Sequence, residues 1–267
     1  MASGWIAAAI AVFAWWFSTG AILVAVRWAD QRGLQAHRRT VILGLPLLAF
    51  GLWGLASTRH DTTVAAAYLG FAAALSVWGW IEMAFLSGII TGPNRRDCPP
   101  GAPEWERFVR AWGTIAYHEI LLIAATVVAA LAAAEAPHGF GFWTFIVLFL
   151  ARVSAKLNLF FGVRKIHTEF LPKPLRHLPS HFRIRQTTWP FALSVTLITL
   201  ALGCWLERLH TAASPAEAVG FSLLAAITAL ALLEHWLMAL PLPDERLWRW
   251  MLPKPAKTLT QEDAHGL

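Results

Sequence analysis

The sequence predicts an all-α integral membrane protein, built as a single bundle of seven transmembrane helices. Hydrophobic residues make up 57% of the 267 residues and charged residues only 14%, the reverse of the balance in a soluble chain. Seven segments approach or exceed the roughly 20 mostly apolar residues that a helix needs to cross about 30 Å of hydrocarbon. They are residues 3–26, 40–57, 64–90, 111–134, 142–163, 189–206 and 217–240.

The first segment has the pattern of a membrane span and not that of a cleaved signal peptide. No basic residue precedes its apolar run, and Arg27 follows it. The later segments favour helices over barrel strands because they are continuously apolar, as in residues 124–134, and do not alternate apolar with polar residues. The absence of a visible internal repeat argues against a transporter built from inverted repeats.

The basic residues predict the orientation of the bundle. Of the 22 lysines and arginines, 20 fall in one set of alternating connections or beside it, and only Arg59 and Arg208 fall in the other set. Since basic residues accumulate on the cytoplasmic side, we expect a periplasmic N-terminus and a cytoplasmic C-terminus. The net charge of +6 is then explained by orientation and lipid headgroups, and no nucleic-acid-binding motif accompanies it.

The transmembrane domain is expected to cover residues 1–253. Residues 164–188 and 241–253 are predicted to lie in the interface on the cytoplasmic side, and residues 254–267 to form a polar, disordered tail. Prolines at 172, 174 and 179 prevent a continuous helix in the first of these segments. The histidines near them, His167, His177 and His181, are expected to face solvent or headgroups.

Ionisable residues inside the spans gather at one depth. At 1.5 Å per residue, Glu82, His118, Glu119, Glu234 and His235 all lie roughly 9–12 Å below the predicted cytoplasmic boundary, and Lys156 and Asn158 reach a comparable level. Burying a single charge in hydrocarbon costs at least about 2.5–3.5 kcal/mol, which favours a shared cluster over separate sites.

Three interpretations of this cluster stay open. The residues can neutralise one another and specify helix packing, bind a divalent metal or the magnesium of a chlorin, or form a proton or ion path. Adjacent pairs such as His118 and Glu119 point about 100° apart on a helix, so both members cannot easily bind one metal. No nucleophile elbow, phosphate loop, zinc motif or dinucleotide fingerprint is present.

Two blocks of sequence resemble a known family. They are Lys156-Leu-Asn-Leu-Phe-Phe-Gly-Val163 with Glu169-Phe-Leu-Pro172, and Leu233-Glu-His-Trp236 with Leu240-Pro-Leu-Pro-Asp244 and Leu247-Trp-Arg-Trp-Met-Leu-Pro253. The chain thereby resembles the PuhE family, photosynthetic complex assembly proteins of anoxygenic phototrophic bacteria. The likeness is strongest over the last 110 or so residues.

The resemblance implies a role in the inner, intracytoplasmic membrane as an assembly factor for the reaction-centre and light-harvesting complex. An alternative that it implies is a role in adjusting bacteriochlorophyll supply to that complex. We expect the polar cluster to hold bacteriochlorophyll or a precursor transiently, and the partners to be reaction-centre subunits, antenna subunits or other assembly factors. The resemblance places Lys156, Asn158, Glu169, Glu234 and His235 inside the matching motifs. The alternative is a metal-dependent membrane enzyme of pigment or quinone metabolism, with the metal held by Glu82, His118, Glu119, Glu234 and His235.

Overall fold

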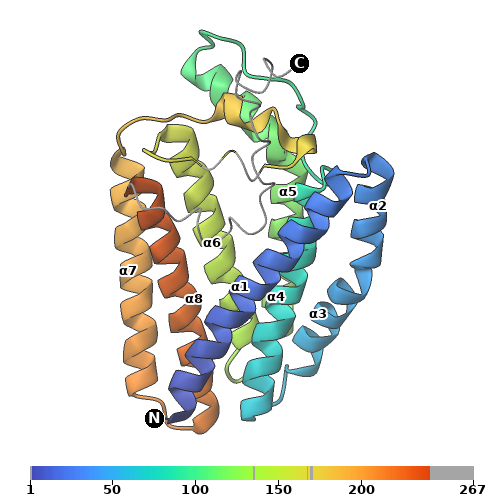
Figure 1. Ribbon diagram of the computed structural model, residues 1–267. Helices are drawn as coiled ribbons and strands as arrows, with labels where there is room; N and C mark the ends of the chain where they lie inside the picture. The colour runs from blue at the N-terminus through green and yellow to red at the C-terminus, as the bar shows by residue number, and fades with distance from the viewer. Residues whose placement is uncertain (1, 135, 167, 169–170, 241–267) are drawn as a thin grey trace, which may run out of the picture.

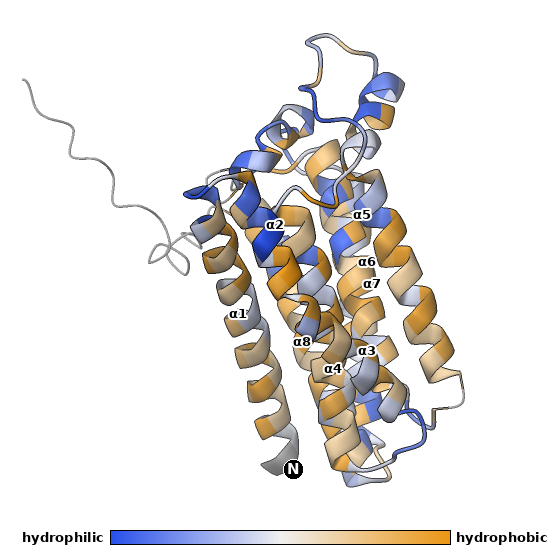
Figure 2. Cartoon of the chain, turned by 90° about the vertical axis from the view of Figure 1, so that its right-hand side faces the viewer, coloured by the Kyte–Doolittle hydropathy of each residue, from blue (hydrophilic) through white to orange (hydrophobic). Residues whose placement is uncertain are grey.

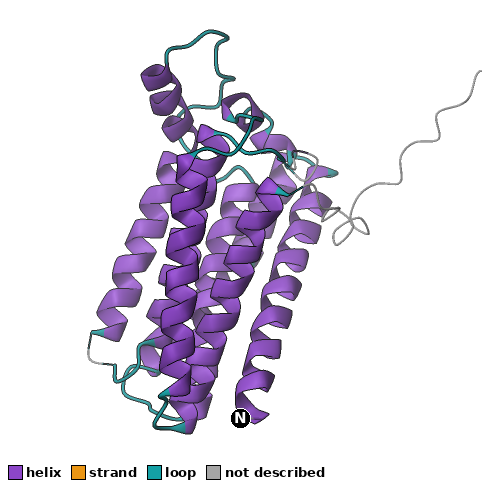
Figure 3. Ribbon diagram, turned by 90° about the vertical axis from the view of Figure 1, so that its left-hand side faces the viewer, coloured by secondary structure: helices purple, strands orange, loops and turns teal. Residues whose placement is uncertain are grey.

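The protein is a bundle of long, nearly parallel and antiparallel helices (Figures 1 and 3). The computed structural model describes residues 2–134, 136–166, 168 and 171–240. Its helices are α1 (Ala2–Asp30), α2 (Leu34–Leu43), α3 (Leu45–Ser57), α4 (Val64–Leu86), α5 (Glu104–Ala133), α6 (Phe140–Phe161), α7 (Trp189–His210) and α8 (Pro215–Ala239), with short 3₁₀ helices η2 (Lys173–Leu175) and η3 (Leu178–His181).

Seven helical spans within the described residues are long and apolar enough to cross a membrane, with α2 and α3 together forming the second, Leu34–Ser57. This confirms the predicted number of spans. Apolar residues fill the middle of the bundle and polar residues mark its two ends (Figure 2).

Several predicted boundaries were wrong. The second span starts at Leu34 and not at residue 40, and α5 starts at Glu104 and not at residue 111. In both cases the helix continues past its apolar part into polar turns. Helix α4 ends at Leu86 and not at residue 90, because the chain turns at Gly88, whose φ of 70° is left-handed and favours glycine.

The break between α2 and α3 has a local cause. Pro46 lies in the first turn of α3 and has no N–H to continue the helical hydrogen bonds of α2. At the break, a Cβ on Gly44 would come within 2.2 Å of the Met83 side chain, so the glycine lets α4 approach closely. The Trp80 indole donates a hydrogen bond of 3.1 Å to the Val41 carbonyl and joins α4 to the bent span.

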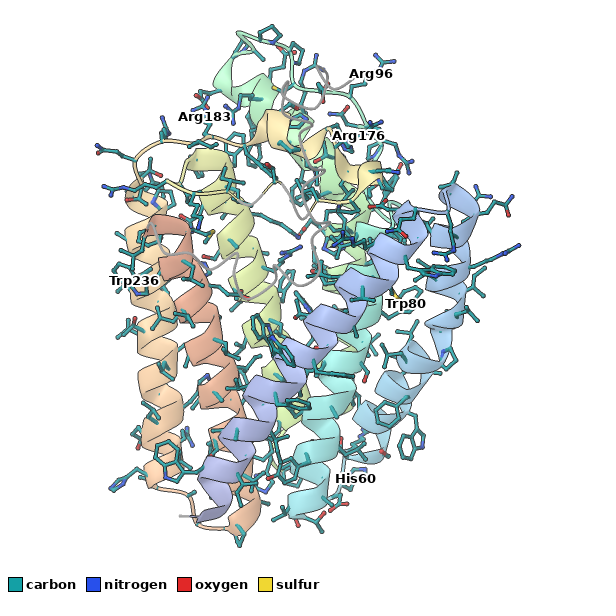
Figure 4. All side chains as sticks on the ribbon, in the orientation of Figure 1. His60, Trp80, Arg96, Arg176, Arg183 and Trp236 are labelled. Atoms are coloured by element: carbon teal, nitrogen blue, oxygen red, sulfur yellow. The ribbon has the colours of Figure 1, made fainter. Side chains whose placement is uncertain are left out.

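One end of the bundle, here called the loop end, carries the two long connections at residues 87–103 and 162–188. Arg96, Arg176 and Arg183 lie at this end, whereas His60 lies at the opposite end (Figure 4). Residues 171–188 form η2, η3 and irregular turns, and Leu175 and Leu178 are buried against Phe85 and Phe182. The predicted interfacial segment 241–253 and tail 254–267 lie outside the described residues.

Helices α4 and α8 lie at the centre of the bundle. Of the residues in the most apolar window of each span, 56% are buried in α4 and 50% in α8, against 11% in α7. Helix α4 packs against α3, α6 and α8, whereas α7 packs mainly against α8. Polar side chains that turn inward from α4 and α8 therefore lie mostly among other helices of the bundle.

Candidate functional site

Helix α6 carries a polar residue at every second position in its second half: Arg152, Ser154, Lys156 and Asn158. Successive residues of an α-helix are rotated by about 100°, so residues four apart share a face and residues two apart lie on nearly opposite faces. Arg152 and Lys156 therefore point one way, toward α4 and α5. Ser154 and Asn158 point the other way, toward α7 and α8.

The first face forms an ion-pair network with α4 and α5. Arg152 Nη2 donates a hydrogen bond of 2.9 Å to Glu82 Oε2, and the Glu82 residue is only 8% exposed. The other carboxylate oxygen, Oε1, lies 3.7 Å from Nε2 of the fully buried His118. That distance is too long for a hydrogen bond, and neither ring nitrogen of His118 has a partner among the described residues. The His118 ring packs instead against Phe85, with 4.4 Å between ring centroids.

Lys156 completes this network. Its ammonium group forms an ion pair and hydrogen bond with the buried carboxylate of Glu119. His118 and Glu119 are neighbours on α5, so their side chains diverge: one faces Glu82 on α4 and the other faces Lys156 on α6. The network thus pairs two carboxylates with two cationic side chains, which lowers the free-energy cost of burying the four charges.

The second face forms a neutral hydrogen-bond network. His235 Nδ1 donates to the Ala231 carbonyl at 2.8 Å, which leaves Nε2 as the acceptor for the Ser154 hydroxyl at 2.7 Å. Asn158 Nδ2 donates to Ser194 Oγ on α7 at 2.9 Å and to the Ser154 carbonyl at 3.0 Å. This network fastens α6 to α7 and α8 and occupies both ring nitrogens of His235.

Two cavities adjoin the first network. A cavity of about 330 Å³ lies between α1, α4, α6 and α8, and its polar wall includes Glu82, Arg152 and Glu234. A second cavity, of about 300 Å³, lies between the loop end of α4, α5, α6 and residues 166 and 171–182, and includes Glu119 and Lys156. We call these the central cavity and the lateral cavity. They share four lining residues: Leu86, Arg152, Ala155 and Leu171.

The structure separates the sequence-predicted residues into groups. Glu82, His118, Glu119 and Lys156 belong to the ion-pair network, whereas Asn158 and His235 lie on the opposite face of α6. Glu234 faces the central cavity, where Arg152 and Glu82 are near enough to act on it electrostatically. Glu169 lies outside the described residues.

Sequence analysis missed Arg152, Ser154 and Ser194. Arg152 was counted among the basic residues that predict orientation, although it and Lys156 lie within α6 and at some distance from the loop. The alternation of polar residues along 152–158 would have indicated two polar faces on this helix. Counting the depth of each residue in the membrane does not reveal it.

The described residues do not form the metal site of the alternative hypothesis. No three histidine, cysteine, aspartate or glutamate side chains among them are grouped so as to hold a metal ion. Arg152 lies against Glu82, Lys156 against Glu119, and His235 is bonded to Ser154. The five proposed ligands therefore lie in three separate environments and do not converge on one point.

The expectation that the loop histidines face solvent was wrong for two of them. His181 is 2% exposed and its Nε2 lies 3.3 Å from the Arg96 carbonyl, while His177 is also buried. Burial lowers the pKa of both imidazoles below the ordinary value of 6.5. His167 lies outside the described residues.

Comparison with known proteins places the chain in a family. The family model described as "Protein of unknown function (DUF3623)" matches residues 1–259. The chain belongs to the DUF3623 family. A relative from Rhodobacter capsulatus, named "Uncharacterized 30.4 kDa protein in puhA 5'region", is 52% identical over 264 residues, which cover 98% of this chain and 96% of the relative. No solved structure matches this DUF3623 protein.

Proposed function

We propose that this DUF3623 protein is an inner-membrane assembly factor for the photosynthetic reaction-centre and light-harvesting complex, and that it handles bacteriochlorophyll or a precursor transiently. The observation that carries the proposal is the relative whose name places it in the puhA 5' region, because the likeness spans nearly the whole of both chains. That name points to a photosynthesis gene cluster. The motifs shared with the PuhE family support the same role.

The central cavity supports the pigment part of the proposal. Magnesium in a chlorin accepts an imidazole nitrogen or a carboxylate oxygen as a further ligand. His118 lines neither cavity, and His235 uses both ring nitrogens in hydrogen bonds. Glu234 is the remaining candidate, since its side chain is accessible, lines the central cavity and has no hydrogen bond to another described residue.

The size of the central cavity favours transient handling over permanent storage. Its volume of about 330 Å³ is near the lower limit for small-molecule sites. A chlorin macrocycle is larger than that, so the cavity would enclose one edge of the ring, next to Glu234, and leave the rest to lipid or to a partner helix. We place the loop end of the bundle in the cytoplasm, because nearly all basic residues of the described chain lie at that end.

The test uses a phototrophic host that lacks its own copy of the gene. The chain, its Glu234→Ala variant and a Leu233→Ala control would each be expressed there, with protein level followed by immunoblot and assembled complexes by near-infrared absorption. Leu233 is the matched control because it is exposed on the outer surface next to Glu234. We expect Glu234→Ala to lower the complexes at unchanged protein level and Leu233→Ala to leave both unchanged.

Full assembly in the host without any copy of the chain would refute the proposed role. Full assembly with Glu234→Ala, at normal protein level, would remove Glu234 and the pigment part from it. His235→Ala should behave differently from Glu234→Ala and lower the amount of folded protein, because it removes the buried hydrogen bond between Ser154 on α6 and His235 on α8.

A further inference from the structure

The lateral cavity has a polar end and apolar walls. Its wall includes the aromatic residues Phe85, Phe108, Trp112 and Phe160, together with aliphatic side chains of α6 and of residues 166 and 171–182. Phe108 and Phe160 meet edge to face, with ring centroids 5.6 Å apart. Its charged residues are Glu119, Arg152 and Lys156, which lie deeper in the bundle than the aromatic residues near the loop end.

The polar end is already balanced in charge. Lys156 is paired with Glu119, and Arg152 is paired with Glu82. An anionic or cationic head placed there would add an unpaired charge inside the membrane, which is strongly unfavourable. A neutral molecule adds none.

The same end nevertheless offers unused hydrogen-bond donors. The Lys156 ammonium carries three N–H groups, and Glu119 takes one of them. Arg152 uses Nη2 for Glu82, and 37% of its side chain is exposed. Groups that face a cavity with spare N–H donors are complementary to a ligand with acceptor oxygens.

The volume limits the size of such a ligand. The cavity volume of about 300 Å³ is at the lower limit for small-molecule sites. A head of one or two rings can be enclosed whole in this space, whereas a four-ring macrocycle can be enclosed only along one edge. Ring faces on the wall favour a flat, conjugated head over a bulky one.

We infer that the lateral cavity is a binding site for a neutral, flat, one- or two-ring carbonyl compound dissolved in the membrane, of the chemical type of a quinone. Its carbonyl oxygens accept hydrogen bonds from Lys156 and Arg152, and its ring packs among Phe85, Trp112 and Phe160. This inference concerns a different cavity from the pigment proposal and does not depend on it.

Decylubiquinone is a suitable probe, with decylbenzene as a comparison that has a ring and tail but no carbonyl oxygen. The full-length protein would be placed in phosphatidylcholine nanodiscs and titrated with each compound. Bound compound would be measured after separation and corrected for partition into empty nanodiscs. We expect saturable, one-site binding of decylubiquinone. Decylbenzene should bind at least about tenfold more weakly, because it cannot accept a hydrogen bond from a charged donor.

Two variants locate the binding. Ala111→Trp fills the lateral cavity, since Ala111 lines it, and should abolish saturable binding. The matched control is Ala124→Trp, on the same helix at an exposed position that lines neither cavity, and it should bind like the wild type. The double variant Glu119→Gln with Lys156→Met removes one ion pair without adding a charge, and should weaken decylubiquinone binding while leaving decylbenzene unchanged.

Three results would overturn the inference. One is the lack of any binding above partition, which would mean that only lipid chains enter the cavity. Another is decylubiquinone binding that Ala111→Trp leaves unchanged, which would place the compound elsewhere. The third is equal binding of decylubiquinone and decylbenzene, which would exclude the role of Lys156 and Arg152 as donors. If Ala111→Trp does not fold, the double variant and the decylbenzene comparison still decide.

Discussion

Replacing Arg152 by methionine should destabilise the bundle by about 3 kcal/mol. The change leaves Glu82, which is 8% exposed, as a charge without its 2.9 Å hydrogen-bonded partner. Removing one member of a buried ion pair costs about 3–5 kcal/mol, because the other charge remains buried and unpaired. Arg152 is partly open to the cavities, which places the expected cost at the lower end of that range.

Replacing Glu82 as well should restore the lost stability. In the double variant Glu82→Leu with Arg152→Met no charge is left unpaired, and replacement of a buried ion pair by apolar residues of similar volume is often neutral or stabilising. We therefore expect the double variant to lie within about 1 kcal/mol of the wild type. The two single changes and the double change form a double-mutant cycle that isolates the pair.

Reversible unfolding in lipid–detergent bicelles measures these free energies. The control is Arg110→Met, which breaks the exposed pair between Arg110 and Glu106 one turn apart on α5 and should cost no more than about 0.5 kcal/mol. Two results would contradict the prediction: Arg152→Met costs as little as this control, or adding Glu82→Leu does not restore stability. Either would mean that the Glu82–Arg152 ion pair does not stabilise the fold.

Three further predictions follow from other parts of the structure. Reporter fusions in the loops 87–103 and 211–214 should show cytoplasmic and periplasmic activity respectively, and the reverse pattern would refute the predicted orientation. Because burial lowers the pKa of His177 and His181, stability should be complete above pH 6.5 and fall as the pH drops toward the folded values. Unfolding midpoints at pH 7.5 and 5.5 should show this loss, and replacing both histidines by glutamine should reduce it. Asn158→Leu should cost about 1 kcal/mol in the unfolding assay, because it removes the hydrogen bond between α6 and α7 while Ser194 keeps its bond to the Pro190 carbonyl.

The number of spans was predictable from sequence because the bilayer imposes a length and a hydropathy on each one. The helix ends were harder to predict. Helix α5 begins at Glu104, where charged residues lie in the first turn and hydropathy carries no signal. The part of α2 before residue 40, with Arg38 and Arg39 in it, was taken for a loop for the same reason.

The polar residues were predictable as a group but their partners were not. Depth along a span can be counted in residues, and it brought Glu82, His118 and Glu119 to one level. Which residues face one another depends on the rotation of each helix about its axis, and this is set by packing. Lys156 thus pairs with Glu119 from one face of α6, while Asn158, only two residues on, bonds to Ser194 from the other. Short hydroxyl residues such as Ser194 gave no signal, because a helix in lipid tolerates them without a partner from another helix.

The distribution of charges implies an order in which the bundle comes together. Glu82 is on α4, Glu119 on α5, and their partners Arg152 and Lys156 are both on α6, so neither pair can form within a single span. Each of these three helices therefore carries an unpaired charge until the others are in place, which favours their association soon after insertion. Helix α7 joins α6 through neutral hydrogen bonds, so its own insertion carries no comparable need for α4 or α5. Helix α8 also bonds to α6 through His235, but it brings Glu234 into the cavity that Arg152 and Glu82 line. Both cavities have α6 as a wall and Arg152 as a shared residue, so both are complete only once α6 has packed against its neighbours. Breaking the Glu82–Arg152 pair should therefore impair ligand binding in the lateral cavity as well as stability, even though Glu82 lines only the central one.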